Sequence, residues 1–352
     1  MMSVSLRSAA RRSAKHLLIR AGLEVAALPG AGRLFPSVAG RGVIFTLHHV
    51  RPARGHEFEP NSHLSITPEF LEEAIVAGRE CGLVPVHLED LLQAANSSDT
   101  RKFMCFTLDD GYRDNEKFAA PVFRKHGIPY TIFIAPGFVE RTRTIWWETA
   151  EELTRAAKSF EFDFGRGVEH VKSSSPLEKF VAFERLANFV QTTDEDEAVA
   201  KIDTAAMRVG VNPESIVDRE VMPASELQEL VVDPLVRLGA HTMTHPNLAR
   251  VSEKRLRQEL EDSSARVADY SGHKPKVFAY PYGSRYAVGS REAKAVLDAG
   301  FRLAVTTQPG VVLSSVSLER PAELARVSLN GGYQKRRYVK ALVSGLPFRW
   351  MP

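Results

Sequence analysis

The feature that most limits the fold of this chain is a repeated unit, in which a short apolar run rich in β-branched and aromatic residues is followed by a stretch with helical periodicity. We expect seven of these runs to be strands: Val43–Leu47, Phe103–Leu108, Tyr130–Ile134, Leu238–Ala240, Val277–Tyr280, Leu303–Thr306 and Ala325–Leu329. Expected helices begin at Thr67-Pro68 and span Asn115–His126, Ser252–Ser271 and Ser290–Ala299. This alternation predicts an α/β chain with a mainly parallel sheet, which could form a barrel or an open doubly wound sheet.

One segment interrupts the alternation. Residues 140–225 show no clear strand pattern, and they contain helical patterning and an acidic run at Asp194–Glu197. We interpret this segment as a helical insertion over one end of the sheet. It begins near Trp146 and Trp147, which either pack internally or offer aromatic faces to a sugar ring.

Composition excludes some classes of function. Of the 352 residues, 44% are hydrophobic and 25% charged, which is typical of a domain with a large core, and the net charge of +3 is too small to indicate nucleic-acid binding. Two cysteines form no disulfide framework and fit a reducing, cytoplasmic compartment. No run is apolar and long enough to span a bilayer.

The two ends of the chain are basic. We expect residues 1–40 to be a basic helical extension, residues 41–332 to form the main domain, and residues 333–352 to be a basic tail. A solvated amphipathic helix is the simpler interpretation of the N-terminal charge pattern, and peripheral attachment to the inner face of an anionic membrane through both basic ends is the alternative.

Two neighbouring carboxylates, Asp109 and Asp110, follow the apolar run Phe103–Leu108 directly. Buried carboxylates at a strand end are costly unless a cation is nearby, and the carboxyl ends of parallel strands are where α/β active sites form. A tight turn, with Gly111 at positive φ, is the alternative explanation.

Two histidines, His241 and His245, follow the short run Leu238–Ala240. At this spacing both rings could lie on one face of a helical turn and share a metal, and Pro246 would end that helix. Together with a carboxylate from a neighbouring strand they would form a set of two histidines and one aspartate with a position open for water.

A third motif, Phe278-Ala279-Tyr280-Pro281-Tyr282-Gly283, also lies at a strand end and predicts a rigid turn. The three motifs, Thr107-Leu108-Asp109-Asp110-Gly111, His241-Thr242-Met243-Thr244-His245 and this one, resemble in type and order those of the polysaccharide deacetylase family, carbohydrate esterase family 4. The resemblance runs from about Gly42 to Asn330, with the insertion least covered.

The resemblance implies a distorted, incomplete (β/α) barrel and a metal-dependent hydrolase that removes N-acetyl groups from N-acetylglucosamine-containing glycans. It implies that Asp110, His241 and His245 bind the metal and that Asp109 is the general base. By the same reasoning Thr242 braces the histidine loop, and the Tyr282 N–H lines the oxyanion hole. Zinc is the expected metal, with cobalt, nickel or iron as alternatives. We expect Tyr280, Tyr282, Trp146 and Trp147 to contact substrate.

Two departures from the family pattern are evident. Ala279 stands where the family has an arginine that holds the base, and we expect Arg326, on the last strand, to supply that charge. No histidine follows His273, so the family's late acid motif is missing, and His48 is the first candidate for the general acid, with His49 second. These departures leave two alternatives open: a metal hydrolase of another C–N bond, such as a cyclic imide or allantoin-like amide, and a carbohydrate-binding pseudoenzyme.

Overall fold

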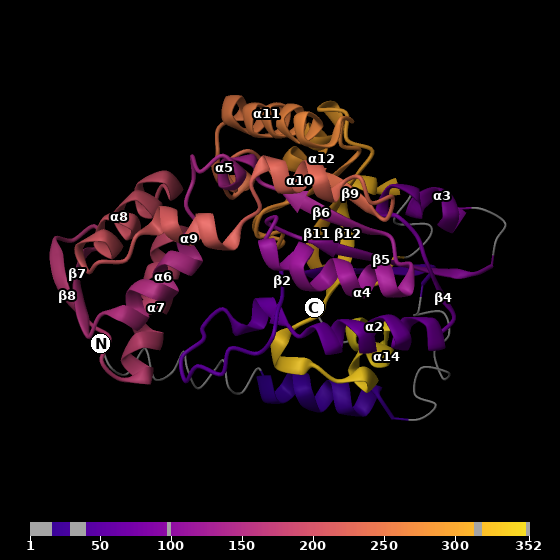
Figure 1. The fold of residues 1–352 in the computed structure, drawn as a ribbon, viewed down its shortest axis with the longest axis horizontal. Helices are drawn as coiled ribbons and strands as arrows, with labels where there is room; N and C mark the ends of the chain where they lie inside the picture. Colours follow the sequence, from indigo (N-terminus) through magenta and orange to yellow (C-terminus); the bar gives the residue numbers. More distant parts are fainter. Residues whose placement is uncertain (1–15, 29–39, 97–99, 313–318, 350–352) are drawn as a thin grey trace.

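A computed structural model describes residues 16–28, 40–96, 100–312 and 319–349. Its centre is a parallel sheet, shown in Figure 1, and the bounds of its eight strands are β1 (Gly42–Leu47), β4 (Leu83–Pro85), β5 (Lys102–Leu108), β6 (Tyr130–Ile134), β9 (Val236–Ala240), β10 (Val277–Ala279), β11 (Leu303–Pro309) and β12 (Leu324–Ser328). The strands are ordered β1-β12-β11-β10-β9-β6-β5-β4, and β1 also pairs with β5. Because β1 and β5 pair, seven strands close into a ring, and β4 is added beside β5.

The expected distorted (β/α) barrel is therefore confirmed, with seven strands instead of the eight of a complete barrel. Each of the seven predicted apolar runs forms one of these strands. Buried apolar side chains fill the strands on both faces, as a parallel sheet requires; all six residues of β1 are buried, for example.

Helices cover the outside of the ring. They are α2 (Pro68–Glu80), α3 (Leu91–Asn96), α4 (Ala120–His126), α10 (Ala224–Leu230), α11 (Glu253–Ser271) and α12 (Ser290–Asp298). The predicted starts and stops are present: the Thr67 side chain caps the first turn of α2 by accepting from Phe70 N, and α11 ends at Gly272 in the left-handed conformation. The predicted helix Asn115–His126 begins with a π-helical turn, Asn115–Ala119, before α4.

Two short strands, β2 (His49–Val50) and β3 (Ser65–Ile66), form a separate small sheet beyond the end of β1. This sheet matters for the site because it fixes the backbone of His49 directly after the barrel strand.

The segment from about residue 140 to 225 forms a lobe to one side of the barrel (Figure 1). After the short α5 (Pro136–Val139), the lobe contains the helices α6 (Trp146–Ala156), α7 (Pro176–Thr192), α8 (Glu195–Arg208) and α9 (Pro213–Glu220). The expectation of helices alone was wrong in one respect: β7 (Ser159–Asp163) and β8 (Val168–Lys172) form an antiparallel hairpin within the lobe. Trp146 and Trp147 are the first two residues of α6.

The two ends of the described chain meet outside the barrel. Residues 16–26 form a helix, as expected for the N-terminal extension, although the first fifteen residues lie outside the described part of the chain. Residues 336–343 form α14 (Arg336–Val343), which packs against α2. The expected basic tail is thus largely a packed helix. No helix in the described ranges is both long and apolar enough to cross a membrane.

Candidate active site

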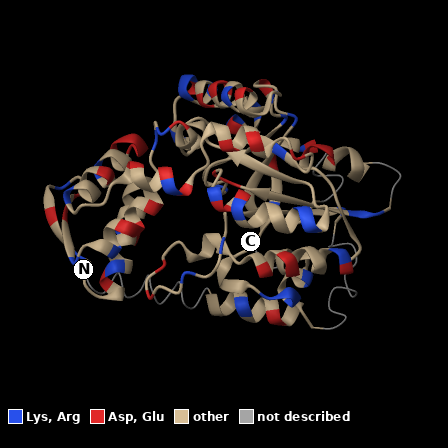
Figure 2. Cartoon of the chain, in the orientation of Figure 1, with Lys and Arg blue, Asp and Glu red and all other residues tan. Residues whose placement is uncertain are grey.

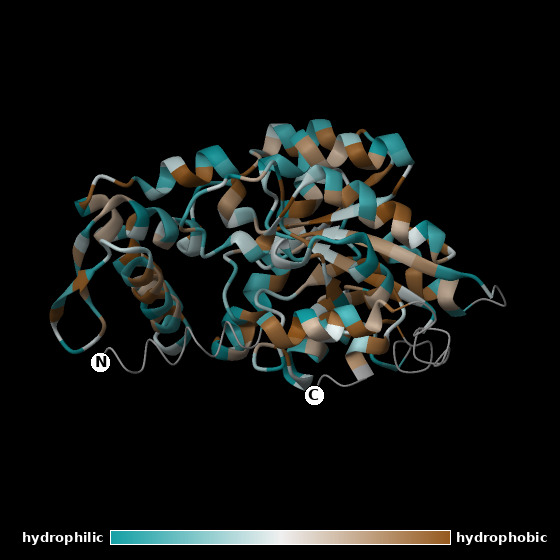
Figure 3. Ribbon diagram, turned by 90° about the horizontal axis from the view of Figure 1, so that it is seen from below, coloured by the Kyte–Doolittle hydropathy of each residue, from teal (hydrophilic) through white to brown (hydrophobic). Residues whose placement is uncertain are grey.

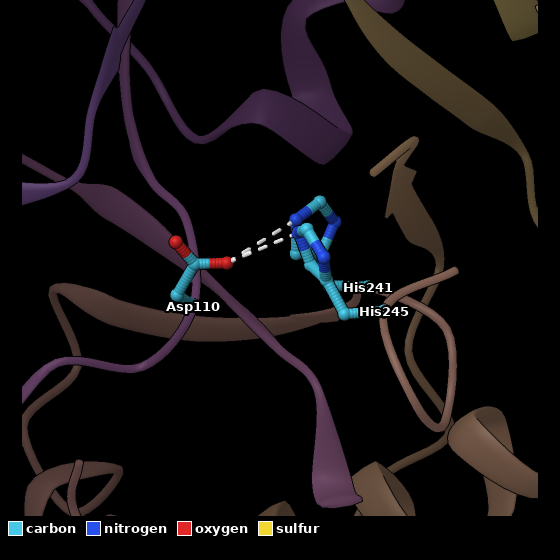
Figure 4. Close-up of side chains that lie close together, drawn as sticks. All are labelled: Asp110, His241 and His245. Atoms are coloured by element: carbon cyan, nitrogen blue, oxygen red, sulfur yellow. Dashed lines mark ion pairs between the residues drawn. The ribbon is translucent and has the colours of Figure 1, made fainter. Parts of the chain in front are cut away.

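Three side chains that could bind a metal converge at the carboxyl ends of β5 and β9. Asp110 lies just beyond β5, and His241 and His245 follow β9; Figure 4 shows the carboxylate directed toward both rings. The Oδ1 atom of Asp110 is 3.5 Å from the Nε2 atoms of both His241 and His245. All three side chains are buried, and one ligand atom from each lies within 4.8 Å of the others. They form the one such cluster in the described part of the chain.

The protonation chemistry of this cluster suits a cation. Burial lowers the pKa of both histidines, so their rings are neutral and keep a lone pair for a metal. The His241 Nδ1 contacts the Ala279 carbonyl oxygen at 2.7 Å, so Nδ1 carries the hydrogen and Nε2 is left free to face Asp110. Burial, with Asp109 nearby, raises the pKa of Asp110 to about 8, and its Oδ1 has no hydrogen-bond partner. A buried carboxylate oxygen without a partner is compatible with a metal ligand and is costly otherwise.

Asp109 and Arg326 form a buried, bidentate ion pair. Arg326 Nη1 and Nη2 donate to the two carboxylate oxygens of Asp109, each at 2.7 Å. The guanidinium extends from β12 across the barrel interior, where its Nε also donates to the Thr306 carbonyl at 2.8 Å. Arg326 holds the pKa of Asp109 well below its usual range despite burial, which opposes that shift. The contact expected between these two residues is therefore present, and the cation missing at Ala279 is supplied from a different strand.

His48 and His49 occupy opposite situations. His48 Nε2 lies 3.9 Å from Asp109 Oδ2, and its side chain is partly exposed. Burial lowers the pKa of His48 to about 3, so this ring is neutral at pH 7. His49 is fully buried, with Nδ1 2.6 Å from Asp114 Oδ2 and Nε2 3.5 Å from Glu148 Oε1. Burial opposes protonation of His49, but the two carboxylates outweigh it and raise its pKa to about 9.

The histidine loop has a different conformation from the expected helical turn. Residues 241–245 are not helical, and both Thr242 and His245 have left-handed backbones, with φ of 60° and 58°. Asp110 and Tyr282 share this conformation, at 75° and 61°, so four of the five non-glycine residues with positive φ in the described ranges belong to this site. Each costs about 1–3 kcal/mol and persists only where surrounding contacts fix it.

Thr242 and Glu259 supply the contacts that fix the histidine loop. The Thr242 hydroxyl accepts from His245 N at 2.9 Å, which agrees with the bracing expected of it. Glu259, buried on α11, accepts from Met243 N at 2.9 Å and Thr244 N at 2.8 Å through one oxygen, and from the Thr244 hydroxyl at 2.6 Å through the other.

The helical lobe contributes a wall of the site. The Trp147 ring lies 5.0 Å from that of His245, and its Nε1 donates to the Tyr112 hydroxyl at 2.9 Å. Trp146 Nε1 donates to the Tyr282 hydroxyl at 3.1 Å. The insertion therefore does more than lie over the sheet, because Trp147 packs beside a metal-ligand candidate and Trp146 contacts Tyr282.

A carboxylate from the lobe completes this wall. The Tyr282 hydroxyl donates to Glu195 Oε1 at 2.7 Å, and the other oxygen of Glu195 accepts from Asn247 N at 3.0 Å. Glu195, at the start of α8, thereby links the lobe both to the third motif and to the segment after the histidine loop.

Tyr280 differs from expectation. Its side chain is buried, and its hydroxyl donates to the Ala322 carbonyl at 2.8 Å. It belongs to the core of the barrel, so we leave it out of the substrate-contacting set.

Sequence reasoning missed several of these residues, chiefly Glu148, Glu195 and Glu259. Glu259 carried a usable signal: the apolar period of its helix, Leu256, Leu260 and Val267, places position 259 on the buried face, where a charged residue is rarely found without a partner. Glu148 and Glu195 carried none, because their partners lie far away along the chain.

Part of the chain also matches a known protein family. Residues 190–304 match the model of the polysaccharide deacetylase family, a range that contains both histidines and Tyr282 but not the aspartates. A search of curated proteins found no match.

Solved structures resemble this fold over most of its length. A deacetylase from Streptococcus pyogenes, PplD, in complex with acetate, has 15% sequence identity and a TM-score of 0.53, with 82% of this chain and 92% of that chain covered. IcaB from Ammonifex degensii has 17% identity and a TM-score of 0.51, covering 86% and 97%. The polysaccharide deacetylase BC0361 from Bacillus cereus has 14% identity and a TM-score of 0.54, covering 86% and 68%. The family model thus matches residues 190–304 of this chain, and these solved structures share its barrel fold.

Proposed function

We propose that this protein is a metal-dependent deacetylase that hydrolyses the N-acetyl groups of N-acetylglucosamine units in an oligo- or polysaccharide. The observation that carries the proposal is the arrangement of Asp110, His241 and His245 beside a buried Asp109–Arg326 ion pair. The first three residues can bind a divalent ion, and in the ion pair Arg326 keeps the Asp109 carboxylate ionised beside that ion.

The donor set fits such an ion. One carboxylate and two neutral imidazoles leave coordination positions open for water or substrate, and zinc is the default, with cobalt, nickel and iron acceptable to the same ligands. When bound, the ion would polarise the acetyl carbonyl and lower the pKa of water in the site toward about 7.

Asp109 removes a proton from the attacking water. Its bidentate contact with Arg326 fixes its orientation and keeps it ionised across the neutral pH range. As the water oxygen bonds to the acetyl carbon, negative charge develops on the carbonyl oxygen. We assign its stabilisation in part to the Tyr282 N–H, in a turn held by the hydrogen bond from Thr307 Oγ1 to the Tyr282 carbonyl.

His48 then delivers a proton to the leaving amine. His49 is protonated, but it is enclosed by Asp114 and Glu148 and has no access to substrate. His48 has that access but is neutral, so it must first receive a proton. Asp109, 3.9 Å away, holds the proton taken from water and can pass it on. The C–N bond breaks as nitrogen gains that proton, and the products are acetate and the free amine.

Trp146, Trp147 and Tyr282 form the aromatic side of the site, and we assign them to contact with the sugar ring. A carbohydrate-binding pseudoenzyme was the alternative suggested by the missing family arginine and the missing acid motif. The contact of Arg326 with Asp109 argues against it, because Arg326 can take the place of that arginine. Both described cysteines are free, which supports a reducing, cytoplasmic compartment as part of this proposal.

The test combines metal analysis of the purified protein with acetate release from a panel of N-acetylated glycans. Asp110→Ala, His241→Ala and His245→Ala should each lose metal and activity together, because a three-ligand site cannot spare one. Asp109→Asn should keep its metal while kcat falls by roughly 10²–10⁴. Retained occupancy and turnover in any ligand variant would refute the ligand set. Amine release without acetate would favour a different C–N substrate.

A further inference from the structure

The N-terminal helix, residues 16–28 with the short turn that ends it, exposes an apolar face. Leu17, Leu18, Val25 and Leu28 are 60–73% exposed, and these four are among the ten large apolar side chains that the described part of the chain exposes. They lie within twelve residues, and Ala21 and Gly22 continue the exposed face between them. The helix lies at the lower edge of the molecule in Figure 1, the side from which Figure 3 is viewed.

The opposite face of the same helix anchors it to the protein. Leu23 and Ala26 are buried, and Glu24 accepts hydrogen bonds from Lys335, Arg337 and Tyr338 at the start of α14. The anchoring face thus accounts for the position of the helix, and within the described part of the chain it leaves the exposed leucines and valine without a role in the fold. Burial of large apolar side chains is favourable, so a contiguous set left unburied indicates a binding surface.

Basic residues lie beside this helix. Lys335 and Arg337 pair with Glu24 of the helix itself, while Arg336 and Lys340 pair with Glu80 at the end of α2, and all four keep 35–52% of their side chains exposed. Among the described residues these ion pairs set two acids against four bases. Arg20, exposed on the helix itself, adds a further positive charge, and Figure 2 colours the Lys and Arg positions along the ribbon blue. The sequence before the helix continues the trend, since Arg7, Arg11, Arg12 and Lys15 precede the first acidic residue, Glu24.

We propose that this face, Leu17, Leu18, Ala21, Val25 and Leu28 with the cations beside it, docks the protein on the surface of an anionic phospholipid membrane. An apolar helix face flanked by Lys and Arg lies in the plane of the membrane interface, and each basic residue near an anionic surface strengthens the attachment. A second copy of this chain would bring two positively charged faces together, which charge repulsion opposes. The described helix is also too short to span the bilayer.

The contact between His16 Nδ1 and the Tyr333 hydroxyl, at 2.6 Å, places the start of the helix beside the segment that follows β12. That segment lies at the carboxyl end of the barrel, as Asp109 and Asp110 do. The start of the docking helix therefore lies toward the catalytic end of the barrel.

The experiment is co-sedimentation of the full chain with vesicles of phosphatidylcholine containing phosphatidylglycerol, and with pure phosphatidylcholine vesicles. We expect binding to the anionic vesicles, weakening with salt, and a decrease of at least about tenfold in Leu18→Glu/Val25→Glu. Val232→Glu is the matched control, because Val232 is 81% exposed outside this surface, and it should bind like the parent.

Light scattering measures the oligomeric state in parallel. Absence of vesicle binding, undiminished binding of the double variant, or a dimer that the same two substitutions dissociate would each overturn the proposal. The assay requires no turnover, so its outcome is independent of the proposed deacetylase activity. Acetate release from soluble glycans should be unchanged in the double variant.

Discussion

At the scale of single residues, the chemistry depends on how burial and neighbouring charges set the state of a few groups. Asp109 and Asp110 are adjacent in sequence and both buried, yet Arg326 lowers the pKa of Asp109, whereas burial and the neighbouring Asp109 charge raise the pKa of Asp110. Asp109 is therefore ionised across the neutral pH range, as a base must be, whereas Asp110 is fully ionised at neutral pH only when a cation binds beside it.

Arg326→Ala should lower kcat by roughly 10² without loss of bound metal, because Asp109 loses the contact that orients it. Without the guanidinium the pKa of Asp109 rises, so the acidic limb of the pH–rate profile should shift upward. Added guanidinium ion should restore part of the activity, a response that a purely structural role would not give. An unshifted acidic limb would contradict the orienting role.

His49 should make stability depend on alkaline pH. Its pKa is raised from 6.5 to about 9 by Asp114 and Glu148, so its contribution, about 3 kcal/mol, is fully present below pH 6.5 and is lost as pH rises through 9. Melting temperatures measured from pH 6 to 10 should fall less steeply in His49→Gln. His170→Gln, at an exposed position of β8, is the control and should follow the parent.

At the scale of elements, the site depends on a loop that is strained and then held from outside. The segment 241–245 combines two left-handed residues, and α11 holds it through Glu259. The lobe adds Trp147 against His245, so the ligand loop is fixed on two sides. Loss of such supporting contacts commonly weakens metal affinity by roughly 10- to 100-fold.

Glu259→Ala should weaken metal binding by roughly 10- to 100-fold, because Met243 N and Thr244 N lose their acceptor and the loop relaxes. Glu259→Gln should retain most of the affinity, since its carbonyl oxygen can accept from both N–H groups and its amide can donate to the Thr244 hydroxyl. Glu261→Ala, exposed on the same helix, is the control. Equal losses in the Gln and Ala variants would show that charge, and not geometry, is what Glu259 provides.

At the scale of the whole molecule, a bound metal would join parts of the barrel that the sheet holds only indirectly. Asp110 follows β5 and the histidines follow β9, with β6 between these strands. An ion that binds the folded state alone stabilises it by about 2.7 kcal/mol at a hundredfold excess over Kd.

Chelation should therefore lower the melting temperature, and the decrease should be larger at pH 9 than at pH 6. The pKa of Asp110 is raised to about 8 in the metal-free protein, so the stability that its proton provides is present at low pH and is lost as pH rises through 8, whereas the metal-bound carboxylate needs no proton. Calorimetry with and without chelator measures this difference. Asp110→Asn should abolish it, and an equal decrease at both pH values would contradict the assignment.

The sequence by itself determined the seven barrel strands, the capped helices around them and the three candidate metal ligands. Each of these depends on local information: apolar periodicity, a capping residue, or a polar group directly after a buried strand, such as Asp110 after β5. The same local patterns occur in barrels and in open sheets, so they do not distinguish between these two topologies. They also misread the His241–His245 spacing as helical, because the side chains that hold this loop extended lie elsewhere.

The tertiary structure alone decided the contacts that make those ligands a site. Pairing of β1 with β5 closed the ring and brought Arg326 to Asp109 across 217 positions of sequence, and packing of the lobe placed Trp147 on His245 and Glu195 on Tyr282. The β7–β8 hairpin, too, is stable only against the lobe helices that bury one of its faces. Free energies of this kind arise from burial and charge neutralisation between distant segments, and no single stretch of sequence contains both partners.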